Sequence, residues 1–259
     1  SIDALAVGIS FAFLNVNINN NVINNCGSGI YYKTINPKNN NGSRPNTYTC
    51  QGKSYAPTID TASSICGNTI TVVDTADTSS KQFPYGIRLY GENLTANDGI
   101  VLAGDYSAQN VNVSSNNITI SRGANAIWLV GTKNINVSQN TVLFNNSAYR
   151  TKDNVFGLRL ENSTNATINA NTFNANNIPY VQNVIILDKS KGVNIASNTL
   201  TGAKKHGINL TSSSASISAN TISGNKENGI LWHCSTKRKQ CNNKFCKNQQ
   251  KREKRNLHF

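Results

Sequence analysis

Three large side chains occupy the same place in a short recurring phrase, and they are the residues of this sequence best suited to chemistry. The phrase reads Gly or Ala, an apolar residue, any residue, and a second apolar residue. Its variable third position holds Arg88, Trp128 and Arg159. An aromatic face packs on the C–H groups of a sugar ring, and a guanidinium pairs with a carboxylate. These residue types predict a surface that binds a carbohydrate, including one with acidic groups.

Outward positions of this phrase form two predicted rows, and the rows collect most of the large and charged residues. Exposed positions elsewhere are mostly Asn, Ser and Thr. Lys152 and Lys189 lie in or next to the flanking loops. The first predicted row is Tyr31, Arg88, Val101, Trp128, Arg159, Ile186, Asn209 and Leu231. The second is Lys33, Tyr90, Ala103, Val130, Glu161, Asp188, Thr211 and His233.

A second recurring sequence pattern defines the structural repeat that would hold these rows in place, and this pattern is centred on an asparagine. A branched aliphatic residue stands three positions before this Asn and an apolar residue stands two positions after it. The intervals between copies are 47, 48, 24, 31, 27 and 22 residues. We interpret the two long intervals as double steps, with a weaker copy at Asn93 inside the second. The seven copies centre on Asn21, Asn68, Asn116, Asn140, Asn171, Asn198 and Asn220.

Self-similarity with a period of 20 to 30 residues indicates a solenoid. Apolar residues alternate with a period of two and are largely β-branched or aromatic, which predicts strands. Three short strands per turn predict an all-β, single-stranded, right-handed parallel β-helix of roughly eight to nine coils. We expect the asparagines to form a ladder, because each amide can bond to the Asn one coil away. We also expect these asparagines to adopt the left-handed backbone of a tight corner.

These phrases, between about residues 8 and 233, resemble those of the pectate-lyase-like superfamily of β-helix repeat proteins. The resemblance implies that the sheet after the third turn carries the substrate. In lyases of this superfamily an Arg or Lys removes the proton next to a uronate carboxyl group, while acids often bind calcium. That implies catalytic roles for Arg159, Glu161 and Asp188, with calcium as the possible cofactor and no metal ligand assigned. Substrate binding falls to Arg88, Tyr90, Trp128, Lys152 and Lys189.

The sequence also departs from the patterns of enzymes in this superfamily. It lacks the compact run of acids of pectate lyases and the Asp-Pro-His-Asp motif of alginate epimerases. His206 has no visible catalytic partner in the sequence, so we expect a solvated turn histidine. Whether the chain is an enzyme stays open at this point.

Composition divides the chain into a β-helix domain over 1–236 and a basic tail over 237–259, which we expect to be disordered or atypical. The tail holds nine basic residues and one acid, so it supplies +8 of the net charge of +13. An insertion over 33–66 is rich in Asn, Pro, Gly and Ser, and a disulfide such as Cys50 to Cys66 could close it. Equally, the cysteines could be free. Nucleic acid is an expected partner only through this basic tail. At the end of the chain, His233, Cys234, Cys241 and Cys246 could be zinc ligands, but their spacing matches no common zinc site.

Two functional hypotheses remain. The first is a secreted or surface β-helix that binds acidic polysaccharide along one sheet and processes it in a lyase-like or epimerase-like reaction. The second is a structural or adhesive β-helix without chemistry, such as the shaft of a surface protein or a viral spike. No run of 18 apolar residues occurs, so no membrane span is predicted. The absence of Met and a start inside a repeat suggest a fragment or processed chain. We expect an extracellular or cell-surface protein, either monomeric or trimeric.

Overall fold

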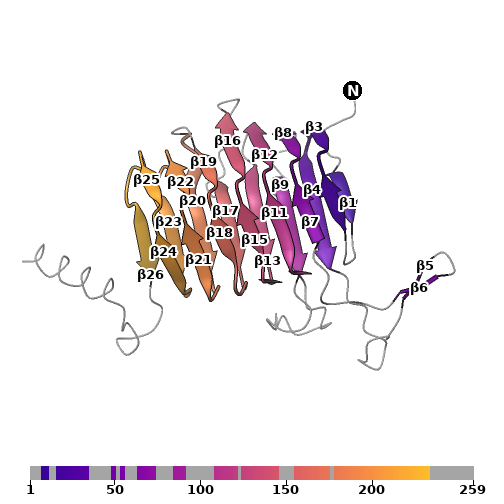
Figure 1. The fold of residues 1–259 in the computed structure, drawn as a ribbon. Coiled ribbons are helices and arrows are strands. Elements are labelled where there is room, and N and C mark those ends of the chain that lie inside the picture. The colour runs from indigo at the N-terminus through magenta and orange to yellow at the C-terminus, as the bar shows by residue number, and fades with distance from the viewer. Residues whose placement is uncertain are drawn as a thin grey trace, which may run out of the picture.

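The structure is a computed structural model that describes residues 7–11, 16–34, 48–50, 53–55, 63–73, 84–91, 108–121, 124–145, 155–175 and 178–233. These residues form three long parallel sheets, which we call sheets A, B and C. Along the axis from β1 to β26, successive coils lie side by side (Figure 1). The described residues contain no helix that is long and apolar enough to span a bilayer.

Each coil contributes one strand to each sheet, in the chain order B, C, A. Sheet A contains β1 (Val7–Phe11), β4 (Ser28–Thr34), β9 (Tyr85–Gly91), β13 (Asn125–Val130), β17 (Val155–Glu161), β20 (Val181–Asp188), β23 (His206–Thr211) and β26 (Ile230–His233). Sheet B contains β2 (Asn17–Asn19), β7 (Ser63–Cys66), β11 (Val111–Ser114), β15 (Asn136–Ser138), β18 (Thr167–Asn169), β21 (Val193–Ala196) and β24 (Ala215–Ser218). Sheet C contains β3 (Val22–Cys26), β8 (Thr69–Val73), β12 (Asn117–Ser121), β16 (Thr141–Asn145), β19 (Thr172–Asn174), β22 (Thr199–Thr201) and β25 (Thr221–Ser223).

Two smaller pairings complete the described strands. Strands β10 (Ala108–Gln109) and β14 (Thr132–Lys133) pair in parallel beside the main sheets. Strands β5 (Tyr48–Cys50) and β6 (Lys53–Tyr55) pair antiparallel within the predicted insertion. The expectation of an all-β parallel β-helix is therefore confirmed.

The asparagine ladder runs without interruption from Asn21 to Asn220. At every step the Nδ2 of one ladder Asn donates to the Oδ1 of the next, over 2.9 to 3.0 Å. From Asn68 onward, each Nδ2 also donates to the carbonyl three residues before the preceding ladder Asn, as Asn140 does to Val113. The predicted ladder is confirmed, and its stacked amides satisfy one another in the interior.

Two details of the ladder differ from our expectations. Asn21 bonds directly to Asn68, and Asn68 directly to Asn116, so the intervals of 47 and 48 residues are single coils and not double steps. The left-handed backbone belongs to the residue before each ladder Asn, for example Ser115 at φ 55° and Ala170 at φ 55°. The reason is geometric: the preceding residue turns the chain, which leaves the Asn side chain free to point inward.

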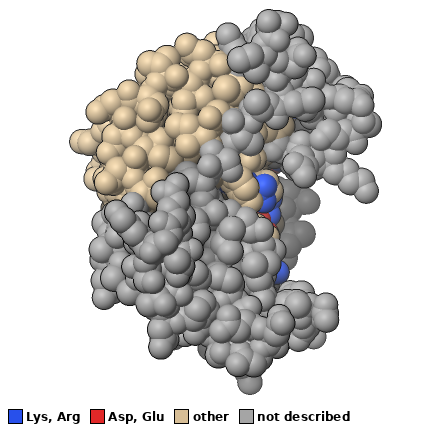
Figure 2. Space-filling model, turned by 90° about the vertical axis from the view of Figure 1, so that its right-hand side faces the viewer, with Lys and Arg blue, Asp and Glu red and all other residues tan. Residues whose placement is uncertain are grey.

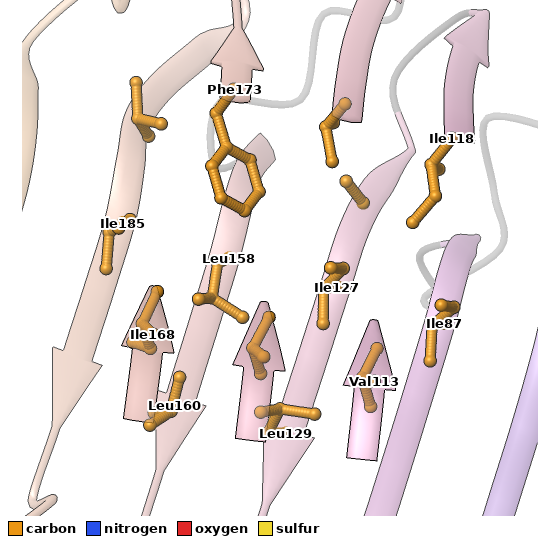
Figure 3. Close-up of a cluster of buried hydrophobic side chains, with 14 of the residues drawn as sticks. Ile87, Val113, Ile118, Ile127, Leu129, Leu158, Leu160, Ile168, Phe173 and Ile185 are labelled. Carbon is orange, nitrogen blue, oxygen red and sulfur yellow. The ribbon is translucent and has the colours of Figure 1, made fainter. Parts of the chain in front are cut away.

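The interior is filled by the aliphatic positions predicted from the repeat. Side chains of Val113 and Ile168 from sheet B, Ile118 and Phe173 from sheet C, and Leu158 from sheet A meet in one core (Figure 3). All five are fully buried. Alternation with a period of two sends every second side chain inward, so the residues between them must face outward.

Close packing between coils explains the small first residue of the sheet A phrase. A Cβ added to Gly86 would lie 2.7 Å from the carbonyl oxygen of Ala126 in the next coil, and 2.7 Å from a methyl group of Ile118. A larger side chain at this position would push the coils apart. The small residue thus allows adjacent coils to approach closely enough for the outward residues of sheet A to stack.

Candidate functional site

The two predicted rows exist on the outer face of sheet A. Parallel pairing aligns Tyr31 with Arg88, Arg88 with Trp128, and Trp128 with Arg159, and the row continues through Ile186 and Asn209 to Leu231. The second row aligns Lys33, Tyr90, Val130, Glu161, Asp188, Thr211 and His233. Because β9 pairs directly with β13, no strand lies between them, and the prediction that Val101 and Ala103 extend the rows is wrong. Those two residues and Asn93 lie outside the described residues.

The charged residues Arg88, Arg159, Glu161 and Asp188 lie in the outward rows of sheet A, while others such as Lys133 and Lys226 lie elsewhere on the described surface. In the end-on view of the β-helix from its N-terminal end, nearly all described atoms belong to uncharged residues. The few visible Lys, Arg, Asp and Glu atoms lie close together at one edge (Figure 2). This agrees with the sequence, in which Asn, Ser and Thr provide most of the other outward rows.

Arg88 is packed among four aromatic rings, which together we call the Arg88 cluster. Its guanidinium carbon lies 4.4 Å from the ring centroid of Trp128, 4.9 Å from Tyr90, 5.6 Å from Tyr31 and 5.7 Å from Tyr85. The rings come from β4, β9 and β13, three adjacent strands of sheet A. A guanidinium over aromatic faces is favourable because the ring quadrupole attracts the cation. The stack also fixes the orientation of the guanidinium.

Tyr85 is a member of this cluster that sequence reasoning missed. It begins β9, is 7% exposed, and packs against Tyr31 with ring centroids 5.8 Å apart. Burial raises the pKa of its phenol, and the Ser28 and Arg88 side chains offset part of that rise. Phe156 was missed in the same way, although Trp128 packs edge-on against it at 6.0 Å. Their position in the sequence could have revealed both residues, because each directly precedes the glycine of the sheet A phrase.

Arg159 lies between two carboxylates from adjacent coils. Its Nη2 is 3.4 Å from Oε2 of Glu161 and 3.5 Å from Oδ2 of Asp188, and all three side chains are about one quarter exposed. Its guanidinium carbon also lies 5.9 Å from the Phe156 ring. The structure therefore brings together the three residues predicted to act in catalysis, and we call them the Arg159 group.

Three successive strands carry an N–H group that has no acceptor within the described part of the chain. These donors are Nε of Arg88 on β9, Nε1 of Trp128 on β13 and Nε of Arg159 on β17. All three atoms are buried. An unpaired buried donor costs roughly 1–3 kcal/mol, so each such atom calls for an explanation. These three donors therefore lie beneath the surface of one row of sheet A, shielded from solvent and not open to a ligand in this conformation.

For the two lysines predicted to bind substrate, Lys152 and Lys189, the structure adds little evidence of that role. Lys189 is exposed in the turn that follows β20, directly after Asp188, and its backbone is left-handed with φ 47°. The structure pairs Asp188 with Arg159 and, among the described residues, not with this lysine. Lys152 lies outside the described residues.

His206 differs from our expectation of a solvated turn residue. It is the first residue of β23, is 6% exposed, and has Nε2 3.4 Å from Oε2 of Glu227. Its Nδ1 accepts a hydrogen bond from the backbone N–H of Asn228 at 3.3 Å. Both partners belong to the next coil, which the sequence did not show to be adjacent. Burial lowers the pKa of His206, while the Glu227 carboxylate acts in the opposite direction.

Neither the cysteines nor the acids form a metal site in the described part of the protein. Cys66 is a free thiol that accepts a hydrogen bond from Ser114 at 3.1 Å, so the suggested Cys50–Cys66 disulfide is wrong. Cys26 is also free. No three His, Cys, Asp or Glu side chains come together in a way that could hold a metal ion within the described ranges. Cys234, Cys241 and Cys246 lie outside them.

Comparison with known proteins assigns the chain to a family. No curated protein and no solved structure gives a significant match to it. One family model matches residues 61–256, and its description is periplasmic copper-binding protein (NosD). The matched segment covers most of the β-helix from β7 onward, including Arg88, Trp128 and Arg159. Because this match spans well over half of the sequence, the chain belongs to the NosD family of periplasmic copper-binding proteins.

Proposed function

We propose that this protein is a β-helix of the cell envelope that binds polysaccharide along the outward rows of sheet A. The observation that carries the proposal is the Arg88 cluster, in which a guanidinium and four aromatic rings come together on three adjacent strands of sheet A. Sugars present hydroxyl and ring oxygens to donors, and C–H faces to aromatic rings. A chain laid along the helix axis would meet a new row member at each coil, about 4.8 Å further on.

The family supports the location but not a copper centre in the described residues. Its description places its members in the periplasm, which agrees with an envelope protein. Copper favours thiolate, thioether and imidazole ligands, yet the chain has no Met at all. Cys26 lies on β3 and Cys66 on β7, in different sheets, and His206 is engaged by Glu227 and Asn228. The described residues do not fit a copper site, so no step of the proposed function depends on copper.

The proposal is tested by binding measurements with a panel of oligosaccharides on the full chain. We expect Trp128→Ala to weaken retention by about tenfold, since a buried aromatic platform is a typical centre of binding energy. The matched control is Leu143→Ala, which removes a half-buried outward apolar side chain from β16 of sheet C. Equal binding by wild type and Trp128→Ala would leave only a scaffold, the structural or adhesive alternative.

A lyase reaction on acidic polysaccharide is a second candidate, because Arg159, Glu161 and Asp188 come together. In that reaction Arg159, in its neutral form, would take the proton next to the uronate carboxyl group. The glycosidic C–O bond at the neighbouring carbon would break, leaving an unsaturated uronate and a sugar oxygen that takes up a proton from water. Glu161 and Asp188 would supply oxygen ligands for calcium. The test is incubation with alginate, pectate and glycosaminoglycans while the absorbance of unsaturated uronates is followed. A rise that disappears in Arg159→Ala would establish the reaction, and no rise with any polymer would remove it.

A further inference from the structure

The charges along sheet A are not uniform, and this bears on which polysaccharide fits. The Arg88 guanidinium is surrounded by rings and has no carboxylate partner among the described residues. Two strands further along the sheet, the single positive charge of Arg159 faces the two negative charges of Glu161 and Asp188. The Arg88 cluster is thus cationic, and the Arg159 group taken by itself carries a net negative charge.

The rings make the Arg88 cluster selective for one anionic group. The ring centroids of Trp128 and Tyr90 lie 4.4 and 4.9 Å from the guanidinium carbon. Its N–H groups lie in the plane of the guanidinium, and since Nε is itself buried, a ligand would pair with the terminal Nη groups. A planar carboxylate is the group that pairs with such an in-plane fork of donors. Neutral hydroxyls would satisfy the donors but would leave the charge unpaired.

The Arg159 group has the opposite preference. Its two carboxylates are about one quarter exposed and can accept hydrogen bonds from sugar hydroxyls. A ligand carboxylate at the same place would face two like charges, and like-charge contacts across an interface cost several kcal/mol. The positive charge of Arg159 is already paired with both carboxylates, so it would offset little of the repulsion felt by a ligand carboxylate.

We infer that the ligand is a predominantly neutral glycan that carries isolated carboxylates, one of which pairs with Arg88 while neutral sugars contact Glu161 and Asp188. This inference rests on the proposed function and names its substrate class. A pyranose unit is about as long as the spacing between adjacent coils, so successive sugars reach β9, β13, β17 and β20 in turn. A polymer with a carboxylate on every sugar would always place one against the Arg159 group.

Three oligosaccharides of equal length test the inference by titration calorimetry on the full chain. One is neutral, one is the same backbone with a single uronic acid, and one consists entirely of uronic acids. In EDTA we expect the singly acidic oligosaccharide to bind about tenfold more tightly than either of the others. The double substitution Glu161→Gln with Asp188→Asn keeps the acceptor oxygens and removes the charges. It should strengthen binding of the all-uronate oligosaccharide by about tenfold, because the ligand carboxylates then no longer face like charges.

The outcomes separate this inference from the proposed function. If no oligosaccharide binds, or if Trp128→Ala binds as the wild type does, the proposed function fails and the inference falls with it. If all three bind through Trp128 but the all-uronate oligosaccharide binds as tightly as the singly acidic one, only the inference is overturned. Tight all-uronate binding that appears on addition of calcium would also overturn it, because calcium would then bridge the two carboxylates to the ligand.

Discussion

The guanidinium carbon of Arg88 lies 4.4 Å from the ring centroid of Trp128, although the two residues belong to different coils. Direct parallel pairing of β9 with β13 creates this contact. The two strands belong to successive coils, so residues far apart in the sequence become neighbours along the axis. The binding surface is therefore a property of coil stacking and not of any one segment.

Replacing Arg88 by Lys should weaken binding of the singly acidic oligosaccharide by about tenfold. The substitution keeps the charge, but an ammonium group cannot stack its faces on the rings of Tyr90 and Trp128 or pair in a bidentate way with a carboxylate. The measurement is the dissociation constant by calorimetry. The control is Lys191→Arg, an exchange at an exposed position, and unchanged binding by Arg88→Lys would show that charge alone is used.

Asn140→Ala should lower the free energy of unfolding by about 3 kcal/mol or more. The Asn140 side chain accepts from Asn116 and donates to Val113 and Asn171, and it is 1% exposed, so its removal leaves several buried groups unpaired. Urea unfolding followed by circular dichroism measures the change. As a control, Asn194→Ala removes an exposed Asn from β21 and should change stability by less than about 0.5 kcal/mol. A similar effect in both variants would contradict the role assigned to the ladder.

Ala170→Gly should raise the free energy of unfolding by about 0.5–1 kcal/mol. Ala170 has φ 55°, a left-handed conformation that costs an L-residue about 1–2 kcal/mol and a glycine almost nothing. The greater entropy of glycine in the unfolded chain removes part of this gain. The matched control is Ala196→Gly within β21, where φ is not positive. We expect Ala196→Gly to lower the free energy of unfolding. If both substitutions lower it, the left-handed backbone at Ala170 is not strained.

Stability should fall as the pH drops below about 6.5, the ordinary pKa of histidine in an unfolded chain. The pKa of His206 is lowered in the folded protein, chiefly by burial, so the folded state binds fewer protons than the unfolded state in this range. The contribution of His206 to the free energy of unfolding is complete above about pH 6.5 and is lost as the pH decreases towards the pKa of His206 in the folded state. The measurement is the difference in unfolding free energy between wild type and His206→Gln from pH 8 to pH 5. A wild type that gains stability relative to the variant on acidification would show that the Glu227 ion pair outweighs burial.

Several elements of the fold could be predicted from the sequence, because they depend on local spacing. The positions three before and two after each ladder Asn are buried along the β-helix, except that Ile217 and Ile222 on the last coil are half-buried. The phrase around Arg88, Trp128 and Arg159 likewise placed these residues on one outward row. Period-two alternation fixes the direction of a side chain without knowledge of the rest of the chain.

Other features required the tertiary structure, because they depend on which coils are adjacent. The sequence by itself determined the strand period, the ladder and the outward rows. It did not determine that the intervals of 47 and 48 residues are single coils. One coil with a long connecting segment and two coils of ordinary length contain the same number of residues, so the spacing alone cannot distinguish them. Nor did the sequence place Glu227 against His206, or show that Arg159 forms ion pairs with both Glu161 and Asp188. Those contacts arise only when parallel pairing selects the neighbours, because backbone hydrogen bonds between coils, and not distance along the chain, bring the side chains together.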